Sequence, residues 1–202
     1  MRDSPKFASV ALACVVLMAG CGSGEGDAGA QAEVVANAAV GAEAGLELAN
    51  LRRTLELARD KFSQLAVAMP EGDYAWATMD GVRSVGAVFQ HVVADNYFVP
   101  SLMGMTAPEG AGVTNDVETF RAFQAQSLSK AEIVAHVEAS FAFMIESMDA
   151  TAAELDRAMM LGQSETTVGD VWIRAVVHLH EHLGQSIAYA RSNGVVPPWS
   201  MP

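Results

Sequence analysis

Cysteine is almost absent from this chain of 202 residues. Its two cysteines, Cys14 and Cys21, both lie within the first 21 residues, and none follows. The rest of the chain therefore has no thiol from which a disulfide framework could form. Catalysis by a cysteine of that region is excluded for the same reason, and so is a zinc site built from thiolates.

Positive charge is also scarce. There are 12 Lys and Arg residues against 24 Asp and Glu residues, so the formal net charge is −12. A chain with this balance repels the phosphates of nucleic acids, and we therefore expect no DNA or RNA partner. The sequence also offers no polybasic patch for anionic lipid headgroups.

The first 27 residues, MRDSPKFASVALACVVLMAGCGSGEGD, have the pattern of an export signal. Arg2 and Lys6 precede an apolar run over residues 7–19, which is too short to stay in a bilayer as a permanent helix. The run ends in LMAGC, which resembles the lipobox of bacterial lipoproteins, where the signal is cut before the cysteine and its thiol is acylated. Met18 stands where leucine is commoner.

This pattern predicts three segments. Residues 1–20 are expected to be a lipoprotein signal peptide, and residues 21–44 a flexible linker rich in Gly and Ala that becomes helical near its end. Residues 45–202 are expected to form the folded domain. The mature protein would be exported and anchored to the bacterial cell envelope by a lipid on Cys21. A soluble secreted or periplasmic protein is the alternative.

No stretch of the chain alternates apolar and polar residues with a period of two over a useful length, so no strands are expected. From about residue 45, apolar residues recur every three or four positions instead. This spacing predicts four long amphipathic helices and one short helix. They lie within residues 45–69, 85–105, 117–126, 127–159 and 161–194.

Polar residues of the capping type mark the helix starts. Ser84 is a candidate N-cap, and Ser129 with Glu132, like Thr167 with Asp170, has the spacing of a capping box. Four long helices without strands predict an all-α fold, a four-helix bundle. The connection between the second and third long helices is long, which disfavours a simple up-down-up-down topology.

Histidine is rare, yet three of the five histidines lie in VVHLHEHLGQ, residues 176–185. Each helical residue advances by about 100°, so His178 and His182 share one face, whereas His180 lies about 200° from His178. Two imidazoles at this spacing suit zinc, nickel or iron. A third ligand would have to come from another helix, and spacing alone leaves His91 and His136 both open. A histidine pair with no ligand is the ordinary alternative.

Two segments resemble the motifs of the DinB-like family. SVGAVFQHVVADNYF resembles its second-helix motif, in which an apolar helix carries one metal-binding histidine followed by an acidic and an aromatic residue. HLHEHLGQ resembles its last-helix motif, H-x-x-x-H-x-G-Q. GVRSVG and NGVVPPWS are similar to the family as well, and the resemblance covers residues 46–200.

The resemblance implies a metal site and a topology. His91, His178 and His182 would be the metal ligands, and His136 and His180 would lie outside the site. The helical pattern itself separately predicts that His136 and His180 are exposed. Zinc or nickel is the expected metal. The implied fold is an up-down-down-up bundle with a long crossover between the second and third long helices, and many members are dimeric, so a homodimer is one expectation.

Residues next to these histidines have candidate roles. Asp95, four positions after His91, would orient a ligand or accept a proton, although a plain surface carboxylate is an equal alternative. Gln185, three positions after His182, would hydrogen-bond a ligand or substrate. Gly184 is expected to allow close helix packing, and Glu181 is expected to point into solvent.

Three histidines leave a tetrahedral metal one open position, which suits either of two chemistries. The metal could acidify a water for hydrolysis, or it could bind the thiolate of a cosubstrate for an S-transferase reaction, and the family resemblance implies both. Export disfavours the thiol, since bacterial low-molecular-weight thiols are chiefly cytoplasmic. We therefore expect a metal-dependent hydrolase of an unknown small-molecule substrate. A thiol-dependent S-transferase is the second reading, and a non-enzymatic surface lipoprotein that binds metal or a partner is the third.

Overall fold

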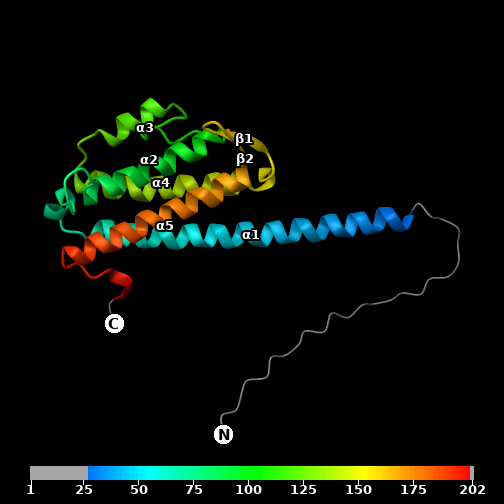
Figure 1. Cartoon of the computed structure of the whole chain (residues 1–202), viewed down its shortest axis with the longest axis horizontal. Helices are drawn as coiled ribbons and strands as arrows, with labels where there is room; N and C mark the ends of the chain where they lie inside the picture. Colours follow the sequence, from blue (N-terminus) through cyan, green and yellow to red (C-terminus); the bar gives the residue numbers. More distant parts are fainter. Residues whose placement is uncertain (1–26, 201–202) are drawn as a thin grey trace, which may run out of the picture. The chain divides into compact units, whose positions relative to one another are not determined.

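The computed structural model describes residues 27–200 (Figure 1). The predicted signal peptide and Cys21 lie outside the described residues, so the division into signal, linker and domain stays a prediction. The chain separates into two units between residues 42 and 43. Helix α1, Asp27–Ala68, begins earlier in the predicted linker than expected, consistent with the high helix propensity of its alanines. Within the described part, no helix is both long and apolar enough to cross a membrane.

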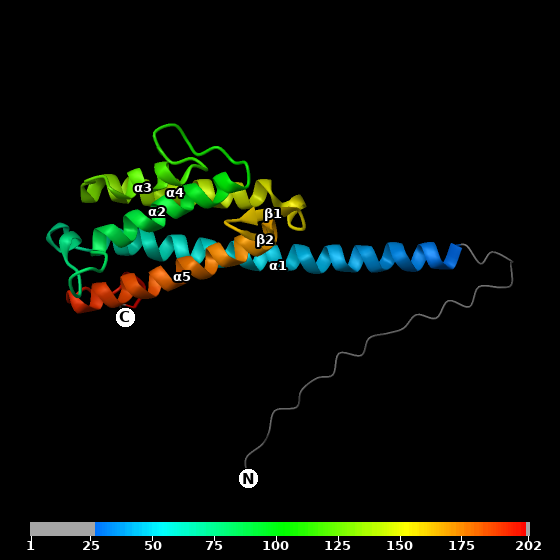
Figure 2. The same cartoon turned by 45° about the horizontal axis from the view of Figure 1, so that its top comes forward.

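Four long helices build the second unit, in the predicted up-down-down-up arrangement. The chain runs in one direction along α2 and α4 and in the opposite direction along α5 and the part of α1 after residue 42 (Figures 1 and 2). The long crossover between α2 and α4 carries the short helix α3. The bounds are α2 Val85–Leu102, α3 Val117–Gln124, α4 Lys130–Ala150 and α5 Val168–Ser192.

The predicted caps set the starts of three helices. The Ser84 hydroxyl accepts a hydrogen bond from the backbone at the start of α2. Ser129 and Glu132 form a complete capping box at the start of α4. Thr167 caps α5 by accepting from the backbone N–H of Asp170. The Asp170 carboxylate does not complete that box, because it accepts from Thr166 and Arg174 instead.

The absence of strands is the part of the fold prediction that is wrong. Strands β1, Ala158–Leu161, and β2, Ser164–Thr167, form an antiparallel hairpin. Gly162 opens its two-residue turn with φ +63°, a conformation that glycine adopts without strain. Four residues per strand are too few to show a period of two, so the pattern was hidden between two helices.

Helix α4 ends nine residues before the predicted limit, Met159, because Thr151 is tied into the core. The buried Thr151 hydroxyl donates to the carbonyl of Ser147, 2.9 Å away. It also accepts from Nε1 of Trp172 on α5 at 2.9 Å. The short 3₁₀ helix Ala152–Glu154 then leads the chain toward β1.

Aromatic packing joins α1, α2 and α4. Phe62 is fully buried, and its ring centre lies 6.3 Å from that of Phe89 and 5.6 Å from that of Phe141. Leu55 and Leu65, on the same helix α1, are also fully buried. This core fixes α2, and α2 in turn packs on α3, α4 and α5. The helix that carries His91 is therefore held on several sides.

Candidate metal centre

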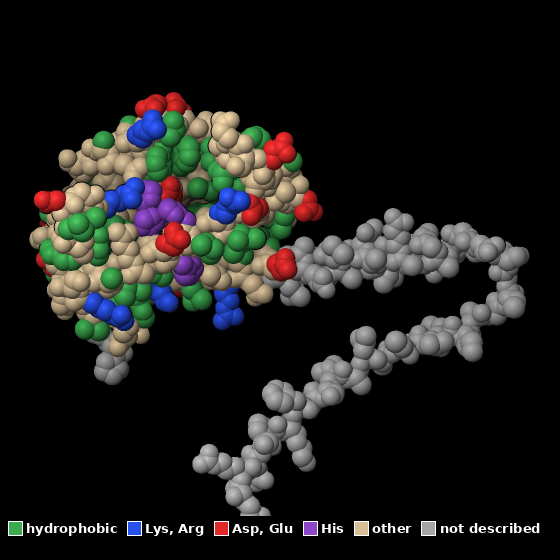
Figure 3. Space-filling model, in the orientation of Figure 1, with side chains coloured by type: hydrophobic (Ala, Val, Ile, Leu, Met, Phe, Trp, Pro, Cys, Tyr) green, Lys and Arg blue, Asp and Glu red, His purple; other side chains and the backbone are tan. Residues whose placement is uncertain are grey.

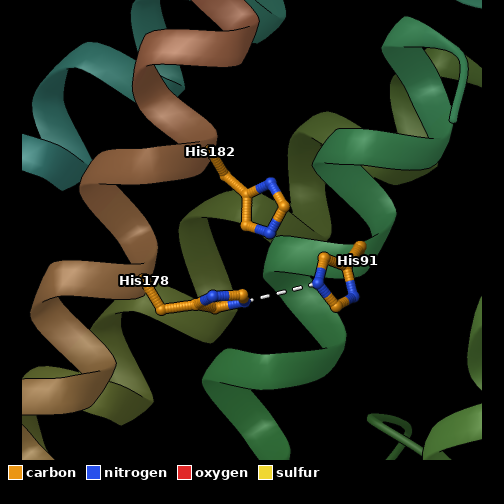
Figure 4. A group of neighbouring side chains, drawn as sticks. All are labelled: His91, His178 and His182. Atoms are coloured by element: carbon orange, nitrogen blue, oxygen red, sulfur yellow. Dashed lines mark hydrogen bonds between the residues drawn. The ribbon is translucent and has the colours of Figure 1, made fainter. Parts of the chain in front are cut away.

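Three histidines converge from two helices. His91 comes from α2, and His178 and His182 lie one turn apart on α5 (Figure 4). The Nε2 atoms of His91 and His178 are 3.3 Å apart, and one ring nitrogen from each of the three lies within 4.8 Å of the others. Two nitrogen ligands of a tetrahedral zinc ion, each about 2.0–2.1 Å from it, are themselves about 3.4 Å apart. The spacing therefore fits a shared cation.

Glutamine side chains hold two of the rings from outside. Nδ1 of His91 lies 3.0 Å from Oε1 of Gln124, and Nδ1 of His182 lies 3.0 Å from Oε1 of Gln185. A neutral imidazole that donates from Nδ1 carries its lone pair on Nε2. Oxygen partners of this kind orient metal-binding histidines and select the tautomer that can bind. In this tautomer, Nε2 of His91 and Nε2 of His182 are available to bind a cation.

Two carboxylates contact His178. Glu181 Oε2 lies 3.7 Å from the outer nitrogen, Nδ1. On the inner side, Asp95 Oδ2 lies 3.0 Å from Nε2 of His178 and 3.1 Å from Nε2 of His91. Asp95 is one helical turn after His91, and its side chain is only 17% exposed.

This arrangement places several hydrogen-bond acceptors close to one another. When His91 and His178 both donate from Nδ1, their two Nε2 lone pairs and the Asp95 carboxylate face one another within 3.3 Å. Acceptors cannot satisfy each other, so the cluster needs a proton or a metal cation among them. The donor set and its geometry fit a divalent metal.

The three imidazoles have different pKa values in the absence of a cation. Burial lowers the pKa of His91 and of His182 below 6.5. The hydrogen bond to Asp95 raises the pKa of His178 above 6.5. Of the three rings, His178 is therefore the one that binds a proton most readily, and His91 and His182 bind one less readily.

Comparison with known proteins identifies the family. The model of the DinB superfamily matches residues 54–186, which run from within α1 to a point in α5 just past His182. The chain belongs to the DinB superfamily. Two crystal structures support the DinB-like fold. A DinB-like protein from Bacillus cereus ATCC 10987 has a TM-score of 0.62 at 12% identity, covering 73% of this chain and 93% of its own.

The second structure is a DinB-like protein from Bacillus subtilis. It has a TM-score of 0.54 at 15% identity and covers 72% of this chain and 92% of its own. At these identities the likeness shows a shared fold and no more. No curated protein matches the chain.

The two remaining histidines, His180 and His136, lie outside the cluster of His91, His178 and His182, as expected. His180 is exposed, and its Nδ1 lies 2.8 Å from the carbonyl oxygen of Val176. His136 is half-buried rather than exposed, because its ring packs edge-on against Tyr97 and Phe123, with centroid distances of 6.3 and 5.2 Å. Its role is packing within the bundle.

Two residues next to the cluster histidines differ from the predictions, and a third agrees with them. Glu181 is exposed but does not simply point away, since it approaches His178. Gly184 does not permit close packing, because a Cβ there would meet nothing within 4 Å. Gln185 contacts the cluster histidine His182, as predicted, and its amide also donates to the Tyr189 hydroxyl at 3.0 Å.

Gln124 is the site residue that sequence reasoning missed. It lies on α3, 33 positions after His91, so no helical spacing links it to the motif. The buried amide of Gln90 places it by donating to the carbonyls of Phe123 at 2.6 Å and Gln126 at 3.0 Å. These bonds fasten the end of α3 to α2, one residue before His91.

The centre is open to one side. Histidine side chains are visible beside a hollow in the surface, with acidic and basic groups around them (Figure 3). The side chain of His178 is 41% exposed, whereas that of His91 is 10% exposed. An open cleft of about 440 Å³ borders Asp95 and His178. A small molecule can therefore approach the cluster from the α5 side.

Proposed function

We propose that this DinB-superfamily protein binds one divalent transition metal, zinc or nickel, through His91, His178 and His182. The supporting observation is the set of acceptors that face each other within 3.3 Å, with outer nitrogens held by oxygen atoms. Imidazole nitrogen is a preferred ligand of both metals. Three protein ligands and an open cleft are typical of a site that exchanges a small molecule rather than of a closed structural site.

We further propose that the protein is a hydrolase of a small-molecule substrate. A divalent cation held by three imidazoles would supply a Lewis acid. Asp95 has its Oδ2 on the inner side of the cluster and borders the cleft, where it can accept the proton of an attacking water. Gln124 and Gln185 keep two of the rings oriented.

Metal analysis of protein without a histidine tag tests the binding proposal. Wild type should carry about one zinc or nickel ion per chain, and His91→Ala, His178→Ala and His182→Ala should each carry almost none. His180→Ala is the matched control, because His180 lies on the same helix and outside the cluster. Full metal content in any folded variant of the cluster would contradict the proposal.

The hydrolase proposal is tested with Asp95→Asn. This variant should keep its metal while ester or amide turnover falls by about 10²–10⁴-fold, the usual range for a general base. A screen of small esters and amides with metal-loaded wild type supplies the substrate. Conversion that requires an added low-molecular-weight thiol would instead identify an S-transferase. Metal binding without turnover in any screen would favour a binding role.

Attachment to the cell envelope is a separate proposal. It rests on LMAGC at residues 17–21 and on the apolar run before it. Labelled fatty acid should enter the full-length chain when it is expressed in bacteria and should not enter the Cys21→Ser variant. Equal labelling of both would contradict lipidation at Cys21.

A further inference from the structure

The cleft beside the metal centre has apolar walls from three elements. Asp95 and His178 form its inner end. Its apolar side chains come from α2, β1 and α5, and they include Val99, Leu161, Val171, Ile173 and Val177. At about 440 Å³, the cleft is within the size range of small-molecule sites, which are typically concave and mostly apolar with a few polar groups.

Two of these wall residues are unusually exposed for their type. Ile173 is 53% exposed and Val177 is 55% exposed, and they lie one turn apart on α5. Neighbouring exposed aliphatic side chains at a concave site are characteristic of a surface that contacts a ligand. Val177 lines the cleft together with His178, so this surface reaches the proposed metal centre.

The charges that border the cleft leave no free cation among its described lining residues. Arg174 lies in the cleft wall, but its guanidinium pairs with Asp170 at 2.8 Å. Asp95 and Glu181 add negative charge at the end nearest His178. A charged group lying along the cleft away from the metal centre would therefore meet mainly aliphatic walls.

A larger cleft, about 710 Å³, lies between α1 and α5 and is lined by Leu48, Leu51 and Trp172 among others. It shares Ile173 with the smaller cleft but contains none of the cluster histidines. Its carboxylates, such as Glu47 and Asp156, do not belong to the histidine cluster. It therefore offers apolar surface without the groups that would react.

We propose that the smaller cleft binds an uncharged apolar part of the substrate, an alkyl chain or an aromatic ring, whose reacting group lies at His178 and Asp95. This assignment rests on the proposed metal site, which supplies the reacting end. The substrate class is thus amphiphilic, with a polar, metal-seeking group on an apolar tail. Ile173 and Val177 determine the preference for the tail.

Straight-chain hydroxamates test the assignment, because they carry a metal-binding group on an alkyl tail of adjustable length. Metal-loaded wild type is titrated with acetohydroxamate, butyrohydroxamate, hexanohydroxamate and octanohydroxamate by calorimetry. Affinity should rise about twofold to fourfold for each added methylene until the cleft is filled, as expected for transfer of apolar surface from water.

The double variant Ile173→Ser/Val177→Ser should lose most of this dependence on length while binding acetohydroxamate within twofold of wild type. Leu57→Ser is the matched control. Leu57 is 51% exposed on α1 and lines neither cleft, so the full dependence on length should persist. Because all three positions are exposed, none of these changes removes core packing.

The outcomes separate the two proposals. If wild type binds metal and acetohydroxamate but longer tails bind no tighter, the apolar cleft assignment is wrong and the metal site stands. The same conclusion follows if the double variant keeps the wild-type dependence on length. If wild type binds neither metal nor acetohydroxamate, the metal site is wrong, and the cleft assignment fails with it.

Discussion

The aromatic core and the histidine cluster share helix α2 but are built in opposite ways. Phe89 belongs to the core and His91, two positions later, belongs to the cluster. The core is closed and apolar, with Phe62, Phe89 and Phe141 each at most 1% exposed. The cluster is partly open and places like acceptors against each other.

This difference separates the source of stability from the site of function. Burial of the core stabilises the bundle whether or not a cation is present. The cluster, without a cation, opposes folding by burying His91 and by crowding acceptors. Metal binding should therefore add stability to a bundle that already folds.

The largest effect is expected in the core. Phe62→Ala should lower the free energy of unfolding by about 3–5 kcal/mol, the usual cost of removing a buried phenyl ring and leaving a cavity. Urea unfolding of the metal-free protein measures it, with the exposed Leu57→Ala as control. The folded fraction should still bind one metal per chain. Loss of metal from folded Phe62→Ala would show that the two regions are coupled.

A smaller effect is expected where the crossover meets the cluster. Gln124→Leu removes the oxygen that accepts from Nδ1 of His91, so metal affinity should fall about 10–100-fold. Competition with a chelator measures this change. Gln126→Leu is the control, since Gln126 is exposed on the same segment and uses only its backbone carbonyl to bond α2. Equal affinities in both variants would remove Gln124 from the site.

The smallest effect concerns protons. Asp95 raises the pKa of His178 above 6.5, whereas burial lowers the pKa of His91 and His182. Metal uptake at pH 7 should therefore release at most about one proton from the imidazoles, that of His178, and this release should fall toward zero as the pH rises through the raised pKa. Calorimetry in buffers of different ionisation enthalpy counts these protons. Release of three protons would mean that His91 or His182 is also protonated, because His178 and a metal-bound water can supply only two.

The sequence predicted features that a regular spacing or a family motif encodes. His178 and His182 follow from a helical repeat, and His91 followed only from the family motif, because His136 satisfied the spacing argument equally well. The caps at Ser84 and Ser129 follow from short-range chemistry. Each of these signals lies within a short stretch of sequence, and the structure shows the features that they predict.

Features that depend on distant contacts were not predictable in the same way. Gln124 reaches His91 only because Gln90 fastens the end of α3 to α2. Helix α4 ends early because Thr151 bonds Trp172, 21 positions later. The half-burial of His136 likewise depends on Tyr97 and Phe123. Each depends on a partner that the local pattern does not contain.

His91 and His178 are 87 positions apart, so a cation shared by them would close a long loop of the chain. It would act as a reversible cross-link in a chain that has no cysteine after position 21. Such a link depends on the supply of metal and is indifferent to the redox state of the surroundings. Chelators, rather than reductants, would then govern how firmly the two halves of the bundle are held together.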